Sequence, residues 1–282
     1  MKLIDLIDTF KKGIFLVDAS GVLYSSNGFL PESNKTFTYL QSKGETFLAS
    51  NNSYHYINDI ANNLNIEGQI NISPTHIISS GQGLAKDPKI KKILNHKLVY
   101  FIGTPSGQQY SLDAPIKGIT NSLKKADVII LAGLNESQAK STITKIINIA
   151  KTNPNIPIIC CNKDHYIRAH NRLQPVVGYF AQEIENNINR PIIWFGKPLK
   201  NFSKLVKNQL KTQKLIPNKN TLFFDDNLEN VIAMQKHLTI SGCWIKDTGI
   251  LYNQNENDLI KKYGKPTYSI SSFNLNKTIT TY

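Results

Sequence analysis

The feature that most constrains this chain is a short apolar run that ends in an aspartate and then turns at a glycine. Residues 14–17 read Ile-Phe-Leu-Val, Asp18 follows directly, and Gly21 comes three residues later. A short apolar run bounded by a turn signal is typical of a buried strand. In open α/β sheets, ligands bind just beyond the carboxyl ends of the strands. Asp18 is therefore placed where a catalytic carboxylate is expected.

Three further apolar runs also end in polar residues. Residues 47–49 lead to Ser50 and Asn51, residues 192–195 lead to the turn at Gly196, Lys197 and Pro198, and residues 221–224 lead to Asp225 and Asp226. Four strand ends thus supply, in order, an aspartate, a serine, a lysine and an aspartate pair. Helices are expected near 2–11, 33–43, 53–64, 202–210, 228–238 and 256–263, with a last strand near 240–245. This alternation predicts a parallel sheet with covering helices.

The long segment over residues 80–190 has an alternation of its own. It contains an expected helix over 84–94, strands over 98–102 and 128–131, a long helix from Glu136, and a strand over 156–161. A second sheet-and-helix layer inserted into the first is the expected shape of a cap. We therefore predict a discontinuous core domain over 1–79 and 191–282 and an inserted α/β cap domain over 80–190. Residues 277–282 are expected to form a loose tail.

Composition favours two modest domains in a soluble, cytoplasmic protein. The chain has 282 residues, of which 40% are hydrophobic, and no apolar run approaches the roughly 20 residues that span a bilayer. The N-terminal residues alternate charged and apolar side chains, which is unlike a signal peptide. The cysteines are odd in number, Cys160, Cys161 and Cys243, which favours reduced thiols over a disulfide framework.

The net charge of +13 raises the question of a nucleic-acid partner. Of the 33 basic residues, however, only Arg168, Arg172 and Arg190 are arginines. Arginine makes the bidentate phosphate and base contacts on which nucleic-acid readers depend, so its scarcity argues against such a role. We predict neither a nucleic-acid nor a membrane partner, and interpret the charge as a lysine-rich surface with a mild attraction for anionic substrates.

The four ordered strand ends resemble the motifs of the haloacid dehalogenase-like hydrolases, most of which are magnesium-dependent phosphatases. The long insert resembles the large α/β cap that is carried by the class IIA, or NagD-like, branch of this family. Three shorter matches agree with that branch: Ser79-Ser80-Gly81, residues 160–164, and Gly178-Tyr179. The resemblance covers nearly the whole chain and implies a Rossmann-like three-layer core with an inserted α/β cap. It also implies a homodimer as one option for assembly.

The resemblance assigns a catalytic role to each strand end. Asp18 would attack phosphorus and form an aspartyl-phosphate, which divides one difficult displacement into two easier steps. The Ser50 hydroxyl and the backbone N–H of Asn51 would hold the phosphoryl oxygens. Lys197 would neutralise charge on the nucleophile and on the transferring group. Taken singly, each residue could instead be a helix cap, a turn residue or a solvated lysine.

The same resemblance implies a Mg²⁺ site. Asp225 and Asp226 would repel each other unless a cation or a lysine lies beside them, and Mg²⁺ prefers such oxygen ligands. The ion would also take a carboxylate oxygen of the nucleophile and the backbone carbonyl of Ser20. Family members often carry a further aspartate a few residues on, where this chain has Glu229 and Asn230. The expected metal affinity is therefore lower than usual.

The segment Asn162, Lys163, Asp164 and His165 resembles the family's substrate-specificity loop, which would hang over the nucleophile. The first three residues are expected to bind substrate. Lys163 and His165 would suit an anionic substrate, but each could equally be a solvated loop residue.

The main departure from the family pattern is Ser20, where the phosphatases normally have a second aspartate that serves as general acid and base. A serine hydroxyl is too weak an acid for this task near neutral pH. The leading hypothesis is a hydrolase that acts slowly on a small phosphorylated metabolite. Two alternatives stay open: a non-catalytic relative that binds a phosphorylated ligand or a protein partner, and a different reaction, such as carbon-halide or carbon-phosphorus cleavage.

Overall fold

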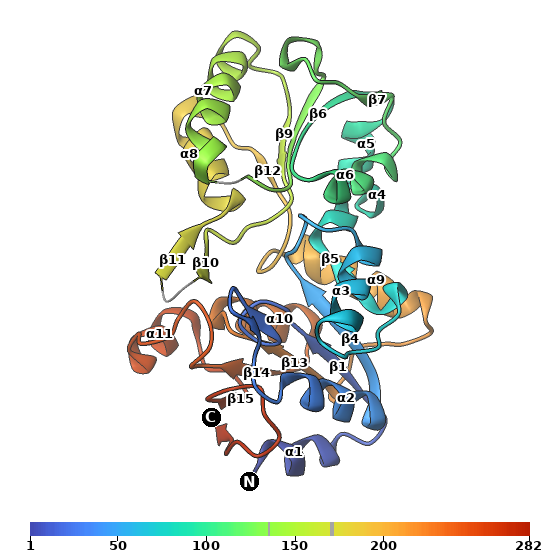
Figure 1. The fold of residues 1–282 in the computed structure, drawn as a ribbon, viewed down its shortest axis with the longest axis vertical. Coiled ribbons are helices and arrows are strands. Elements are labelled where there is room, and N and C mark those ends of the chain that lie inside the picture. Colours follow the sequence, from blue (N-terminus) through green and yellow to red (C-terminus); the bar gives the residue numbers. More distant parts are fainter. Residues whose placement is uncertain (135, 170–171) are drawn as a thin grey trace.

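Two α/β units lie end to end in the computed structural model, which describes residues 1–134, 136–169 and 172–282 (Figure 1). The lower unit, here called the core, contains a seven-stranded sheet in the order β16-β15-β14-β13-β1-β4-β5. All neighbouring strands are parallel except β15 and β16. The strands are β1 (Gly13–Val17), β4 (Gly44–Ser50), β5 (Ile77–Ser79), β13 (Thr221–Asp225), β14 (Ser241–Ile245), β15 (Tyr268–Ile270) and β16 (Thr280–Thr281).

The core has three layers because the side chains of its central strands alternate between two hydrophobic clusters. Phe15 and Val17 of β1 point to one cluster, whereas Ile14 and Leu16 point to the other. The first cluster is closed by α1 (Leu3–Thr9), α2 (Ser33–Lys43) and α3 (Ile57–Ile66), and the second by α9 (Lys200–Thr212) and α10 (Leu228–Leu238). Helix α11 (Glu256–Tyr263) packs on α10.

The upper unit, here called the cap, contains a five-stranded parallel sheet in the order β12-β9-β8-β6-β7. Val128 and Ile130 of its central strand face one side, and Ile129 and Leu131 face the other. Its elements are α4 (Gly83–Lys86), α5 (Pro88–Leu94), β6 (Leu98–Ile102), α6 (Pro105–Leu112), β7 (Gly118–Ile119), β8 (Val128–Leu131), α7 (Glu136–Thr152), β9 (Ile158–Cys160), the hairpin of β10 (Tyr166–Ala169) and β11 (Arg172–Pro175), α8 (Val177–Ile188) and β12 (Ile193–Trp194).

Short elements connect these layers. A small hairpin, β2 (Tyr24–Ser25) and β3 (Gly28–Phe29), follows the first strand, and 3₁₀ turns lie at Pro74–His76, Ser80–Gln82 and Leu123–Lys125. No helix in the described ranges is both long and apolar enough to cross a membrane. The expected α/β class, with a three-layer core and an α/β cap, is confirmed.

The helix expected over 84–94 is in fact two helices, α4 and α5, separated at Asp87. The ψ angle of Asp87 is 122°, which is extended, because the ring of Pro88 disfavours helical backbone in the residue before it. The Asp87 carboxylate accepts hydrogen bonds from the backbone N–H groups of Lys89 and Ile90, and so caps the second helix.

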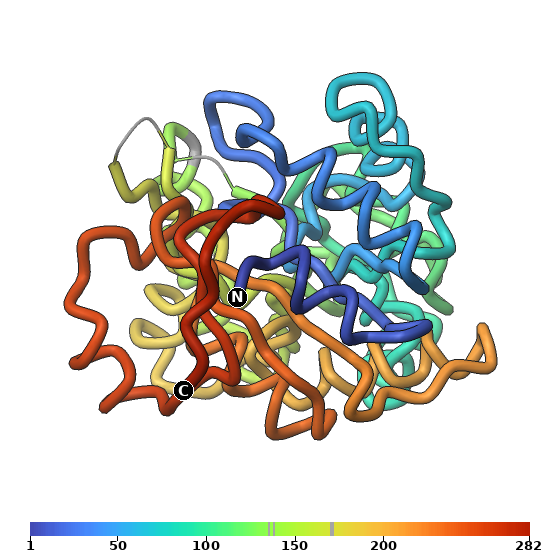
Figure 2. The backbone as a smooth tube through the Cα atoms, turned by 90° about the horizontal axis from the view of Figure 1, so that it is seen from below, coloured from blue at the N-terminus to red at the C-terminus, as the bar shows by residue number. Residues whose placement is uncertain are grey.

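Two further segments differ from expectation. The strand over 192–195 was expected in the core sheet, but β12 pairs with β9 of the cap sheet, so the chain leaves the cap sheet only after Trp194. The tail is not loose: β16 pairs with β15, and the N–H of Ile279 donates to the carbonyl of Met1. The N- and C-terminal segments therefore lie together on the underside of the core (Figure 2).

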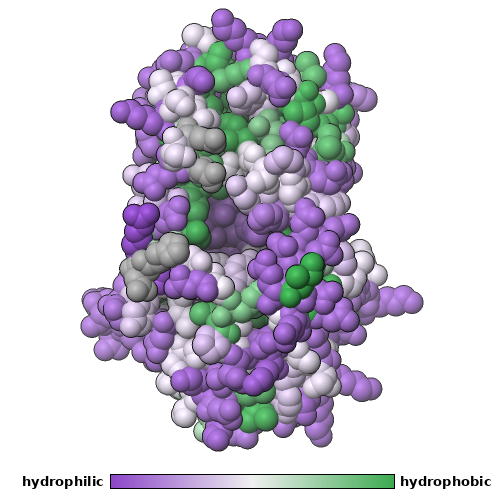
Figure 3. All heavy atoms as spheres, viewed as in Figure 1, coloured by the Kyte–Doolittle hydropathy of each residue, from purple (hydrophilic) through white to green (hydrophobic). Residues whose placement is uncertain are grey.

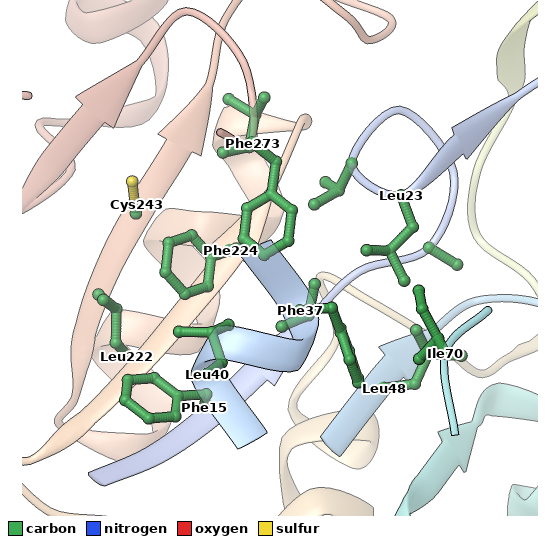
Figure 4. Close-up of a cluster of buried hydrophobic side chains, with 14 of the residues drawn as sticks. Phe15, Leu23, Phe37, Leu40, Leu48, Ile70, Leu222, Phe224, Cys243 and Phe273 are labelled. Atoms are coloured by element: carbon green, nitrogen blue, oxygen red, sulfur yellow. The ribbon is translucent and has the colours of Figure 1, made fainter. Parts of the chain in front are cut away.

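The core depends on close packing of aromatic side chains (Figure 4). Phe37 of α2 is fully buried, and we expect Phe37→Ala to lower the free energy of unfolding by about 3–5 kcal/mol, since it leaves a cavity in a packed cluster. Urea denaturation measures this change. Ile66→Ala is the control, because Ile66 is 78% exposed and should change stability by less than about 0.5 kcal/mol. Equal losses in the two variants would contradict the assigned core.

Candidate active site

Three carboxylates meet at the point where the strand order of the core sheet reverses. Strand β4 continues the sheet on one side of β1, and β13 lies on the other, so the carboxyl ends of β1 and β13 flank a topological switch point. Asp18 follows β1, Asp225 ends β13, and Asp226 comes next. All three are buried, and one carboxylate oxygen from each lies within 4.8 Å of the others.

The Lys197 ammonium lies between two of these carboxylates. Its Nζ is 2.7 Å from Oδ1 of Asp18 and 2.6 Å from Oδ2 of Asp225, and the side chain is 1% exposed. Burial alone would lower the pKa of Lys197, but Asp18, Asp225 and Asp164 outweigh burial and raise it above its ordinary value. The side chain of Asn51 makes two hydrogen bonds with the backbone of Lys197. Its Oδ1 accepts from the Lys197 N–H at 2.7 Å, and its Nδ2 donates to the Lys197 carbonyl at 3.0 Å.

The two neighbouring aspartates have different surroundings. Oδ1 of Asp225 accepts from the backbone N–H of Asn227 at 2.8 Å and from Nδ2 of Asn230 at 3.2 Å. Oδ2 of Asp226 accepts from the backbone N–H of Ile250 at 2.9 Å. Burial raises the pKa of both carboxyls above the ordinary value. Asp225 thus belongs to a hydrogen-bond network, whereas Asp226 keeps its other oxygen free of donors from the described residues.

A divalent cation fits this cluster. Three carboxylates against one ammonium leave an excess of negative charge in a buried place, and hard oxygen donors of this kind suit Mg²⁺ or Ca²⁺. Within the described ranges, Oδ2 of Asp18 and Oδ1 of Asp226 accept no hydrogen bond and so remain available. Gly21 lets the chain pass close by: its φ is +77°, and a Cβ there would lie 2.6 Å from Oδ2 of Asp226.

The loop after β4 supplies polar groups to the same site. Ser50 is 4% exposed, and its Oγ accepts from the N–H of Asn52 at 3.2 Å, which leaves the hydroxyl proton to be donated elsewhere. Two serines at the end of β5 and the start of the insert make hydrogen bonds to the backbone of this loop. Ser80 Oγ donates to the carbonyl of Asn51 at 3.0 Å, and Ser79 Oγ donates to the carbonyl of Asn52.

The cap loop reaches the core through Asp164. Its Oδ1 accepts from Nδ2 of Asn51 at 3.0 Å, and its backbone N–H donates to Oδ1 of Asn162 at 2.7 Å. Burial raises the pKa of Asp164 to about 6, although Lys197 acts in the opposite direction. Lys163 points elsewhere, because its Nζ lies 3.7 Å from the ring centroid of Trp194.

A cavity of about 460 Å³ opens at Asp18 between the core and the cap. Figure 3 shows the surface hollowed there, with hydrophobic side chains at its edge. Among the predicted site residues, its lining includes Asp18, Ser20, Ser50, Asn51, Asn162 and Asp164. Lys163 and His165 line a second cavity of about 380 Å³ instead.

Comparison with known proteins agrees with this geometry. Residues 15–117 match the family model described as haloacid dehalogenase-like hydrolase. No curated protein sequence matches the chain significantly. The similarity in sequence to this family thus covers the first part of the chain, up to residue 117.

Solved structures show the same fold. A possible sugar phosphatase of the haloacid dehalogenase superfamily from Cytophaga hutchinsonii has a TM-score of 0.79 and 22% identity, with 97% of each chain covered. A p-nitrophenyl phosphatase from Archaeoglobus fulgidus has a TM-score of 0.75 and 20% identity, and NagD from Escherichia coli K-12 has 0.70 and 19%. The latter two comparisons each cover 93% of this chain and 97% of the other.

Within this fold, Asn230 lies near the carboxylate cluster and Glu229 does not. Asn230 is 2% exposed, and its Nδ2 donates to Asp225, whereas Glu229 is exposed. Oδ1 of Asn230 is buried and has no hydrogen-bond partner in the described part of the chain. Successive helical residues differ by about 100° in direction, so only one of the two can face the site.

Sequence reasoning missed several residues that line the cavity. Tyr24 and Phe29 reach it from the β2–β3 hairpin, and Tyr54 and His55 reach it from the loop after β4. The Asn27-Gly28 pair is a common hairpin signal and could have located the hairpin, but not its position over the site. Burial, with the nearby Asp18 charge, raises the pKa of Tyr24 to about 12.

The raised pKa of Asp164 predicts a specific pH dependence of stability. The folded protein holds this proton up to about pH 6, whereas the unfolded chain releases it near pH 4, so the stabilising contribution is complete below pH 4 and is lost as the pH rises to about 6. In the metal-free protein, the free energy of unfolding of wild type should therefore fall relative to that of Asp164→Asn across this interval. Urea titrations at several pH values measure the difference, and parallel curves would contradict it.

Proposed function

We propose that this chain is a Mg²⁺-dependent phosphatase that hydrolyses a small phosphorylated metabolite through an aspartyl-phosphate at Asp18. The observation that carries the proposal is the contact of Lys197 with both Asp18 and Asp225, next to Asp226 and at the base of a cavity. A purely structural ion pair would not need a third buried carboxylate or an open chamber beside it.

The residues divide the chemistry among them. A carboxylate oxygen of Asp18 attacks phosphorus, the bond from phosphorus to the leaving oxygen breaks, and water later cleaves the aspartyl-phosphate. The Ser50 hydroxyl and the backbone N–H of Asn51 donate to the phosphoryl oxygens, and Lys197 offsets their charge. Asp18, Asp225, Asp226 and the Ser20 carbonyl would hold Mg²⁺, which supplies further neutralisation of the phosphoryl group.

The structures with the same fold support a phosphomonoester as substrate. Two of them are a possible sugar phosphatase and a p-nitrophenyl phosphatase, and both fold like this chain over at least 93% of its length. Closure of the cap over the cavity would exclude water and select the leaving group. The role of Lys163 in binding substrate stays a prediction.

We expect Asp18→Asn to abolish hydrolysis of p-nitrophenyl phosphate and acetyl phosphate in the presence of Mg²⁺, because the amide is not a nucleophile. Both substrates have good leaving groups, so the lack of an acid at Ser20 should affect them least. Steady-state assays with and without Mg²⁺ measure the loss, and the exposed Asp258→Asn serves as the control that retains activity.

Persistent turnover in pure Asp18→Asn protein would contradict the assigned nucleophile. Mg²⁺ should also raise the melting temperature of wild type, and Asp226→Asn should reduce that rise. If phosphorylated ligands raise the melting temperature but are never consumed, the chain is a binding protein with this fold and not a phosphatase.

We further expect Ser20→Asp to raise kcat on an alkyl phosphate such as ethyl phosphate. Ser20 lines the cavity beside Asp18, and a carboxyl there can protonate the leaving oxygen, an effect worth roughly 10²–10⁴-fold where the geometry is good. The gain on p-nitrophenyl phosphate should be smaller, because nitrophenolate needs little protonation. Ser20→Asn is the matched control of similar shape without an acid, and an equal gain in that variant would contradict the explanation.

A further inference from the structure

The outer walls of the cavity carry acidic groups and, among the described lining residues, no lysine or arginine. Besides Asp18, three acidic residues are among those that line it: Asp164 and the solvent-exposed Glu67 and Glu136. The chain as a whole contains 33 basic residues and has a net charge of +13, so this absence runs against its composition. No ion pair between described residues involves any of the three carboxyl groups.

Helix stability accounts for only one of these acidic positions. Glu136 lies in the first turn of α7, where the helix dipole favours a negative charge. Glu67 is the C-cap residue of α3, where the dipole disfavours a negative charge, and the residue is one of those that line the cavity. Asp164 lines the chamber together with Asn51, and its contact with Asn51 leaves Oδ2 without a donor from the described residues.

Apart from Asp18 and His55, the remaining lining combines apolar side chains with neutral polar groups. Phe29 and Leu64 of the core face Ile167 and Val176 of the cap across the chamber. The volume of about 460 Å³ lies in the range of small-molecule sites and exceeds what a phosphate group alone requires. The only basic side chain next to the nucleophile in the described residues, Lys197, is already engaged by two carboxylates.

We propose that the natural substrate is the phosphate ester of an alcohol that carries no second anionic group, and preferably one that carries an amine on a partly apolar body. This inference rests on the proposed phosphatase function. A carboxylate or second phosphate on the leaving alcohol would enter a chamber lined by Asp164, Glu67 and Glu136, where like charges repel and no cation from the described lining offsets them. An ammonium group would meet favourable charge there, and the apolar walls would pack on its carbon skeleton.

Three aryl phosphates of nearly equal size and leaving-group acidity test the inference: 4-(2-aminoethyl)phenyl phosphate, 4-ethylphenyl phosphate and 4-(carboxymethyl)phenyl phosphate. We expect kcat/KM to fall in that order, with the cationic ester at least about tenfold above the anionic one at low salt. Added salt should reduce the difference in kcat/KM between the cationic and the anionic ester, because it screens the charges. An equal or reversed order would overturn the inference.

The double variant Glu67→Gln and Glu136→Gln tests whether these carboxylates cause the order. It should bring the three kcat/KM values closer together, mainly by raising the value for the carboxylate ester, while turnover of p-nitrophenyl phosphate persists. Glu183→Gln, on the exposed side of α8, is the control and should keep the wild-type order. An unchanged order in the double variant would also overturn the inference.

Failure of the inference can be distinguished from failure of the phosphatase proposal. If wild type hydrolyses p-nitrophenyl phosphate and all three esters equally well, the result supports the proposed phosphatase activity and contradicts only the proposed preference for the leaving group. If none of the four esters is hydrolysed with saturating Mg²⁺ and intact fold, the phosphatase proposal itself fails.

Discussion

The buried ammonium of Lys197 is the interaction on which the rest of the site depends. It joins the carboxyl end of β1 to that of β13 through contacts of 2.7 and 2.6 Å, although the lysine itself comes from the segment that leaves the cap. Loss of one partner from a buried ion pair typically costs about 3–5 kcal/mol, because the other charge is left without compensation. Asp18 is thereby fixed by the same residue that lies at the return of the chain into the core.

This ion pair cannot neutralise the whole cluster. Asp226 adds a third buried carboxylate, and burial raises its pKa. A divalent cation would reverse that trend by supplying the missing positive charge. The orphaned Oδ1 of Asn230, close to Asp225, adds one more polar atom that lacks a partner in the described residues.

Contacts between the cap and the core converge on the site. Asn51 donates to Asp164 at 3.0 Å, and Ser53 Oγ donates to the carbonyl of Ala132 at 2.6 Å. Arg168 of β10 donates through Nε to the carbonyl of Gly249 at 2.8 Å, and the next residue of that loop, Ile250, donates to Asp226. The position of the cap is therefore coupled to the loops that surround Asp18 and Asp226. The cavity is lined by residues of both units, so its shape depends on these contacts.

The sequence by itself determined the local features of this protein. The strands that carry Asp18, Ser50 and Asp225 could be located because apolar runs bounded by turn residues specify buried strands. Tertiary structure decided the rest. The apolar pattern of 192–195 does not say which strand it pairs with, and helical phase turns Asn230 inward and Glu229 outward. Lys163 points to Trp194, and the chamber acquires its acidic walls, because segments distant in the chain meet only after folding.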